Sequence, residues 1–136
     1  KVSQKNSIPK LQVYNNAFIS SKIGMSFNEA RNNPTVWGTL VESAIGSTLL
    51  NYCKDNEAQL MYWRDGNFEV DFVVKHGNSI TAIEVKSGNQ NKGKGFERFK
   101  QCFPNSHCII LGEDNEDYTI NTWDFLRNPQ LYLKFK

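Results

Sequence analysis

Three strand signals in close succession constrain the fold of this chain more than any other feature of its sequence. They span residues 58–64, 68–74 and 80–86 and are rich in β-branched and aromatic side chains. An Asp-Gly pair at 65–66 and a His-Gly-Asn-Ser run at 76–79 separate them, and such residues accept the positive φ angles of tight hairpin turns. The sequence therefore predicts a meander of three antiparallel strands.

The second hairpin has a register that follows from its turn. A turn centred within residues 76–79 pairs residues whose numbers sum to 155. Because side chains alternate along a strand, Asp71 then lies across from Glu84, and Glu69 lies across from Lys86, on one face. We expect that face to carry the charge. The opposite face, with Val70, Phe72, Ile83 and Val85, is expected to be core.

The paired carboxylates suggest a hydrolytic site. Cross-strand partners have Cβ atoms about 4.5–5.5 Å apart, so Asp71 and Glu84 are placed to hold one hard cation between them. Lys86 follows on the same face, where an ammonium can stabilise a transition-state oxygen. Hydrolysis of a phosphodiester with Mg²⁺ fits this set best. The alternative is a solvated sheet face on which Glu69 and Lys86 form a simple cross-strand ion pair.

Helices are expected on both sides of this meander. Asn33 is a good N-cap and Pro34 suits the first helical position, so a long helix begins there. Glu42 falls at the border of its apolar face and can reach a cleft. A short N-terminal strand is predicted within residues 8–14. Further elements are predicted as a helix at 96–103 stopped by Pro104, a buried strand at 107–111, an acidic turn at 113–117 and a helix around 123–126.

Composition limits the classes of protein that this chain can belong to. Its 136 residues suffice for one domain, and 39% hydrophobic and 22% charged residues describe a soluble globular protein. No stretch has the roughly 18 apolar residues of a membrane span, and a cytoplasmic location is expected. The two histidines and three unclustered cysteines exclude an HExxH protease and a zinc ribbon. The cysteines are expected to be reduced and buried.

A basic stretch follows the third strand. Residues 88–95 nearly match a phosphate-binding loop, but Gly95 stands where that loop needs Ser or Thr, which excludes this interpretation. The net charge of +2 neither requires nor excludes a nucleic-acid partner. A cluster of cations is nevertheless placed to hold a phosphodiester backbone beside the acidic pair, and a solvated loop is the alternative. These cations are Lys92, Lys94, Arg98 and Lys100.

Several motifs together resemble the PD-(D/E)XK nuclease superfamily, which includes restriction endonucleases and archaeal Holliday junction resolvases. They are Glu42 on a helix, Glu69-Val70-Asp71-Phe72, and Glu84-Val85-Lys86. More narrowly, these motifs resemble the uncharacterised C-terminal domain that follows the ATPase module of bacterial and archaeal AAA-type ATPases. Further matching segments are Pro9-Lys10-Leu11, Trp37-Gly38-Thr39-Leu40-Val41-Glu42, Tyr62-Trp63-Arg64 and Ile83-Glu84-Val85-Lys86-Ser87-Gly88. Val70 stands where the nominal motif has proline.

The resemblance implies a fold, an activity and a set of site residues. The fold is an α/β restriction-endonuclease-like core, helix-strand-strand-strand-helix-strand with a mixed sheet, at residues 33–112. Residues 1–32 precede it and 113–136 extend it. Asp71 and Glu84, with Glu42, are implied to bind Mg²⁺, for which Mn²⁺ can substitute, and Lys86 is implied to be the catalytic lysine. The expected function is a Mg²⁺-dependent DNA phosphodiesterase attached to an ATPase in one polypeptide. The alternative is an inactive nuclease-like module that mediates partner or DNA binding for the ATPase.

Overall fold

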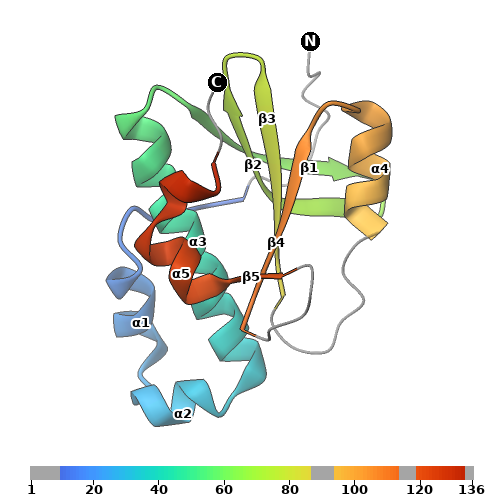
Figure 1. The fold of residues 1–136 in the computed structure, drawn as a ribbon. Coiled ribbons are helices and arrows are strands. Elements are labelled where there is room, and N and C mark those ends of the chain that lie inside the picture. Colours follow the sequence, from blue (N-terminus) through green and yellow to red (C-terminus); the bar gives the residue numbers. More distant parts are fainter. Residues whose placement is uncertain (1–9, 87–93, 114–118, 134–136) are drawn as a thin grey trace.

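The computed structural model describes residues 10–86, 94–113 and 119–133, and they form an α/β fold (Figure 1). No helix within these ranges is both long enough and apolar enough to cross a membrane. The elements, in chain order, are α1 (Ala17–Ile23), α2 (Phe27–Arg31), α3 (Pro34–Asp55), β1 (Gln59–Asp65), β2 (Phe68–His76), β3 (Ser79–Val85), α4 (Lys94–Cys102), β4 (His107–Gly112), β5 (Thr119–Asn121), α5 (Thr122–Arg127) and the 3₁₀ turn η1 (Pro129–Leu131).

The sheet is mixed, as predicted. Its five strands lie in the order β1-β2-β3-β4-β5. The first three form the predicted antiparallel meander, whereas β4 runs parallel to β3 and β5 runs parallel to β4. A parallel neighbour requires a crossover, and α4 lies within the crossover segment that joins β3 to β4 (Figure 1).

Helices cover both faces of the sheet. The larger core lies between the sheet and α3 with α5, and it contains Ile45, Leu49, Phe72, Ile83 and Phe125, each no more than 4% exposed. On the opposite face α4 supplies Phe99, which packs with Val70, Val73 and Ala82. The expectation of one apolar and one charged face is therefore wrong in part, because α4 buries much of the second face.

The long helix α3 begins where its sequence predicts. The side chain of Asn33 accepts a hydrogen bond from the backbone N–H of Val36 at 3.2 Å, and Pro34 occupies the first turn. The helix continues to Asp55, and its buried positions extend from Gly38 to Cys53, with Val41, Ile45, Leu49 and Cys53 four residues apart. The predicted helix at 96–103 and the predicted strand at 107–111 are likewise present as α4 and β4.

The register of the β2–β3 hairpin is confirmed over five pairs. They run from Phe72–Ile83 to His76–Ser79, and the numbers of each pair sum to 155. Gly77 has φ of 55°, a left-handed conformation that its lack of a side chain permits. In the first hairpin Asp65 pairs with Phe68, so the turn residues are Gly66 and Asn67, one position later than predicted.

Strand β2 contains a bulge that the sequence analysis did not predict. On β1, Met61 pairs with Val73 and Trp63 pairs with Val70. Tyr62 on β1 therefore lies opposite two residues of β2, Asp71 and Phe72, and two residues opposite one define a β-bulge. The bulge shifts the alternation of side chains and turns Val70 toward α4, not toward the face of Phe72. Bulges of this kind re-aim side chains, and this one falls at a predicted site residue.

Other differences lie near the chain ends and at the cysteines. Residues 10–14 form no strand, and residues 8–9 of that prediction lie outside the described part. Helices α1 and α2 and strand β5 were not predicted. The acidic turn predicted at 113–117 also lies outside the described residues, except for Glu113. Among the free cysteines only Cys53 is buried, and burial raises the pKa of its thiol to about 11, whereas Cys102 is exposed.

A cluster of three side chains joins α2, α3 and the end of β4. Arg31 donates two hydrogen bonds to the carboxylate of Glu113, at 3.0 and 2.8 Å. The indole N–H of Trp37 donates to the same carboxylate at 3.0 Å, and the guanidinium lies 4.5 Å from the centre of the indole ring. The hydrogen bonds from Arg31 and then from Trp37 hold the pKa of Glu113 below its usual value.

Glu113→Gln is therefore expected to make the chain less stable at neutral pH. The side chains of Arg31 and Glu113 are 44% and 31% exposed, so solvent screens their ion pair. We therefore expect the free energy of unfolding to fall by about 1 kcal/mol at pH 7. A carboxyl whose pKa falls on folding stabilises the protein above its unfolded-state pKa, near 4.5. The stability gap between wild type and variant should therefore close as pH falls below that value.

Urea unfolding at several pH values measures this difference. Glu97→Gln is the control, because Glu97 is an exposed side chain of α4 and its change should leave stability within about 0.5 kcal/mol. A wild-type advantage over Glu113→Gln that stays constant from pH 7 to pH 3 would contradict the assigned role of the carboxylate.

Candidate functional site

Two buried carboxylates lie at the point where β2 separates from β3. Asp71 is 9% exposed and Glu84 is 5% exposed. They flank the last register pair, Phe72–Ile83. Beyond it, the backbone N–H of Val85 donates a 2.8 Å hydrogen bond to Oδ2 of Asp71. The Asp71 carboxylate thus accepts the hydrogen bond that a backbone carbonyl of β2 would otherwise accept, and the bulge in β2 aligns this carboxylate with the N–H of Val85. The structure therefore places Asp71 and Glu84 on neighbouring strands beside this pair, although the direct cross-strand pairing of the two acids that the sequence predicts is not among the register pairs.

The beginning of α4 closes one side of this acidic pair. A Cβ atom built on Gly95 would lie 2.1 Å from the carbonyl oxygen of Glu69 and 3.0 Å from Oε1 of Glu84. Only a residue without a side chain allows so close an approach. Gly95, which the sequence analysis treated as the end of a loop, is therefore a packing residue of the site.

Lys86 stands directly after the acidic strand. It follows the last residue of β3, and its backbone N–H donates a 2.7 Å hydrogen bond to the carbonyl of Leu111 in β4. This bond keeps the chain extended beyond β3, so the alternation of side chains continues from Glu84 to Lys86. The side chain is half-buried. The backbone of Lys86 thus lies against β4, two residues beyond Glu84.

Glu42 is engaged by a lysine that the sequence analysis did not assign to the site. Its carboxylate forms an ion pair and hydrogen bond with Nζ of Lys10. The same ammonium lies 4.9 Å from the centre of the Phe72 ring and 5.5 Å from that of Tyr62. Such distances are those of cation–π contacts. Lys10 thus links the helix acid to the bulge that carries Asp71, although the two lie far apart in sequence.

Tyr62 connects this arrangement to Glu69. Its hydroxyl donates a 3.0 Å hydrogen bond to Oε2 of Glu69. Burial, followed by this bond, raises the pKa of the tyrosine, which keeps it a neutral donor. Glu69 therefore has a partner on β1, whereas the cross-strand pairing with Lys86 that the sequence suggested is not among the register pairs of β2 with β3. Lys10 and Tyr62 occurred in the motifs of the resemblance, and that was the only sequence signal for either.

The acidic pair fits a hard cation that needs only one or two ligands from the protein. Across the described ranges, no three or more His, Cys, Asp or Glu side chains are grouped so as to hold a metal ion. Mg²⁺, however, keeps several waters and binds through one or two carboxylates. Asp71 and Glu84 supply that number, and a cation lowers the cost of burying two carboxylates side by side. Glu42, which forms an ion pair with Lys10, stays a predicted ligand.

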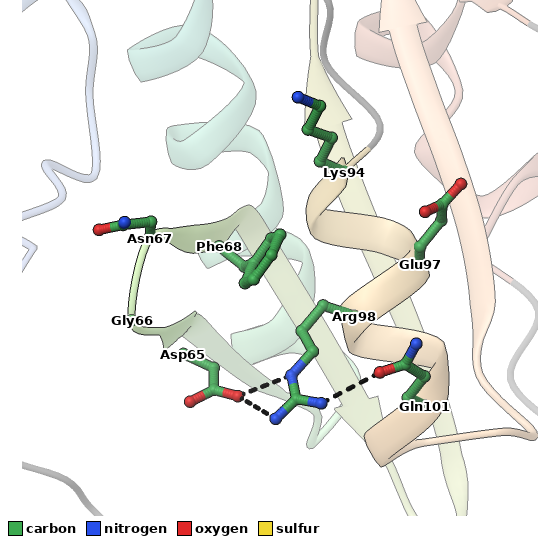
Figure 2. A pocket seen from close by; sticks show the side chains of 8 residues that line it. All are labelled: Asp65, Gly66, Asn67, Phe68, Lys94, Glu97, Arg98 and Gln101. Carbon is green, nitrogen blue, oxygen red and sulfur yellow. Dashed lines mark hydrogen bonds and ion pairs between the residues drawn. The ribbon is translucent and has the colours of Figure 1, made fainter.

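The predicted basic residues are distributed unevenly. Lys92 lies outside the described residues, whereas Lys94 is the first residue of α4 and Lys100 is exposed near its end. Arg98 donates a 2.8 Å hydrogen bond to Asp65 and a 3.0 Å bond to Gln101 (Figure 2). Its guanidinium is thus neutralised within the protein. Lys94 and Lys100 remain as cations of α4 for which the structure gives no acidic partner in the described part of the chain.

Comparison with known proteins assigns the chain to a family. Residues 37–131 match the family described as "Domain of unknown function (DUF4143)", which is more than half of the chain. The chain belongs to this family. The matched region of the DUF4143 domain runs from α3 to η1 and contains the acidic pair, Lys86 and Glu42, whereas Lys10 precedes it. No curated protein and no solved structure is significantly similar to the chain. The match is compatible with the C-terminal domain of AAA-type ATPases.

Proposed function

We propose that this DUF4143 domain is a Mg²⁺-dependent DNA phosphodiesterase with a restriction-endonuclease-like core, attached to an ATPase module. The observation that carries the proposal is the buried pair Asp71 and Glu84, aligned by the bulge and by the Val85 hydrogen bond. Lys86 lies two residues beyond Glu84, directly after the end of β3. The helix-strand-strand-strand-helix-strand order of α3, β1, β2, β3, α4 and β4 supports the proposed core.

Each residue has a chemical task in this proposal. Asp71 and Glu84 would hold Mg²⁺, which when bound supplies a Lewis acid and lowers the pKa of water. Lys86 stabilises the negative charge that develops on the phosphate in the transition state. The hydrogen bond from Val85 fixes the orientation of the Asp71 carboxylate, and fixed orientation removes reorganisation from the reaction. Glu42 and Lys10 hold the neighbouring helix against the bulge.

Two observations favour a second candidate function. Glu42 is paired with Lys10, and the described residues contain no group of three potential metal ligands. Both features are those expected of a nuclease-like module that no longer cuts and instead mediates partner or DNA binding for the ATPase. The two functions differ in whether the acidic pair binds a divalent cation.

Calorimetric titration of Mn²⁺ into the chain distinguishes them. Mn²⁺ shares the oxygen ligands that Mg²⁺ prefers and requires no choice of DNA sequence. We expect binding by the wild type and at least about tenfold weaker binding by Asp71→Asn, since one of two charged ligands is lost. Asp124→Asn, an exposed acid on α5, is the control and should bind as the wild type does. Absence of binding, both alone and with DNA present, would favour the inactive module.

A further inference from the structure

An open depression lies between the β1–β2 turn and α4 (Figure 2). Its volume is about 650 Å³. Phe68 lies between the turn and the helix, and its side chain is 40% exposed, which is unusual for a large apolar residue at the start of a central strand. The residues that line it are Asp65, Gly66, Asn67, Phe68, Lys94, Glu97, Arg98 and Gln101.

The depression and the acidic pair meet at Gly95. A Cβ atom built on Gly95 would lie 2.1 Å from the carbonyl oxygen of Glu69. Phe68 directly precedes Glu69 in β2, and Lys94 directly precedes Gly95 in α4. That Cβ position is also 3.0 Å from Oε1 of Glu84. The depression and the acidic pair are therefore neighbouring features of the contact between β2 and α4.

The charge of the lining selects against a phosphate as the occupant. One Lys and one Arg face one Asp and one Glu, so the formal charges cancel. The guanidinium of Arg98 makes two 2.8 Å contacts with the Asp65 carboxylate and a 3.0 Å hydrogen bond to Gln101. Its N–H donors are therefore already used by a carboxylate, and not by a phosphate. What remains is an aromatic face, a guanidinium plane and the amides of Asn67 and Gln101. An aromatic face and hydrogen-bonding side chains are what an unpaired nucleobase requires.

We infer that this depression binds an unpaired base of DNA, stacked on Phe68, next to the phosphate at the acidic pair. The inference rests on the proposed function, and it specifies the substrate as DNA with a single-stranded segment at the site. A base inside a continuous duplex has no free face for Phe68, whereas a base in a single strand does. Lys94 at the rim supports the backbone electrostatically without selecting sequence.

Binding of fluorescein-labelled oligonucleotides, followed by anisotropy without divalent metal, tests this inference. A single-stranded oligothymidine and a blunt duplex of equal length are the probes. We expect Phe68→Ala to weaken single-strand binding about 5- to 100-fold, the loss of one stacked base, and to leave duplex binding unchanged. Phe68→Trp should restore it. Trp123→Ala is the matched control, because Trp123 is a similarly exposed aromatic residue, at 45%, on α5.

Two outcomes would overturn the inference. One is single-strand binding by Phe68→Ala equal to that of the wild type, and the other is absence of single-strand binding by the wild type itself. Neither outcome would bear on metal binding by Asp71, because the assay contains no divalent metal. Equal losses of single-strand and duplex binding would also overturn the inference, because Phe68 would then be a general contact and not a stacking platform for an unpaired base.

Discussion

Asp71→Asn should abolish the proposed Mg²⁺-dependent cleavage of DNA, with a loss of at least about 1,000-fold. Losing the charge of one of two carboxylates removes much of the attraction for the cation, and the catalysis that depends on the cation is lost with it. Asparagine keeps the shape of the side chain and an oxygen that can accept the hydrogen bond from Val85. Glu84→Gln should have the same effect for the same reason.

The stability of these variants separates a catalytic role from a structural one. Without divalent metal, Asp71→Asn should be as stable as the wild type or more stable, because repulsion from Glu84 is relieved. Cleavage of plasmid and oligonucleotide DNA, together with urea unfolding in a chelator, measures both properties. Asp124→Asn is the control for both. Unchanged cleavage by either variant would contradict the assignment, as would unfolding of Asp71→Asn at a clearly lower urea concentration.

Gly95→Ala is expected to destabilise the chain by about 1–3 kcal/mol, the usual cost of overpacking a filled interior. The added methyl group would lie 2.1 Å from a backbone oxygen of β2. A backbone atom cannot rotate away, so α4 or β2 must shift. The gain in helix propensity from glycine to alanine, at most about 1 kcal/mol, opposes this loss only in part.

The same substitution should also weaken Mn²⁺ binding, because the shift occurs 3.0 Å from Oε1 of Glu84. Urea unfolding and calorimetric titration measure the two effects. Glu97→Ala, an exposed change on the same helix, should leave stability within about 0.5 kcal/mol. If Gly95→Ala proved as stable as the wild type and bound Mn²⁺ equally well, the close contact between α4 and the acidic pair would have no energetic role.

The predictable parts of the fold are those that local sequence controls. Asn33 and Pro34 begin α3 because the cap and the fixed proline φ act within one turn. The β2–β3 register followed from the position of its turn, because pairing in a hairpin propagates from the turn. For that reason Asp71 and Glu84 could be placed on neighbouring strands before any tertiary contact was known.

Other elements depend on contacts with distant residues. The helices α1 and α2 have seven and five residues, too short to be stable alone. Helix α2 is held by Arg31 and by the contact of Phe27 with Trp37, whose ring centres are 5.7 Å apart. Strand β5 has three residues and exists through its pairing with β4. Such segments have little periodicity of their own, so their sequences did not identify them.

The sequence by itself determined the meander, the long capped helix and the neighbourhood of the two acids, because propensity, capping and turn geometry act over a few residues. Only the tertiary structure decided how those acids are aligned. The bulge at Asp71, the contact of Gly95 with Glu84 and the ion pair of Lys10 with Glu42 join segments that are distant in the chain. Their energies come from packing and charge across elements, and no local pattern encodes such contacts.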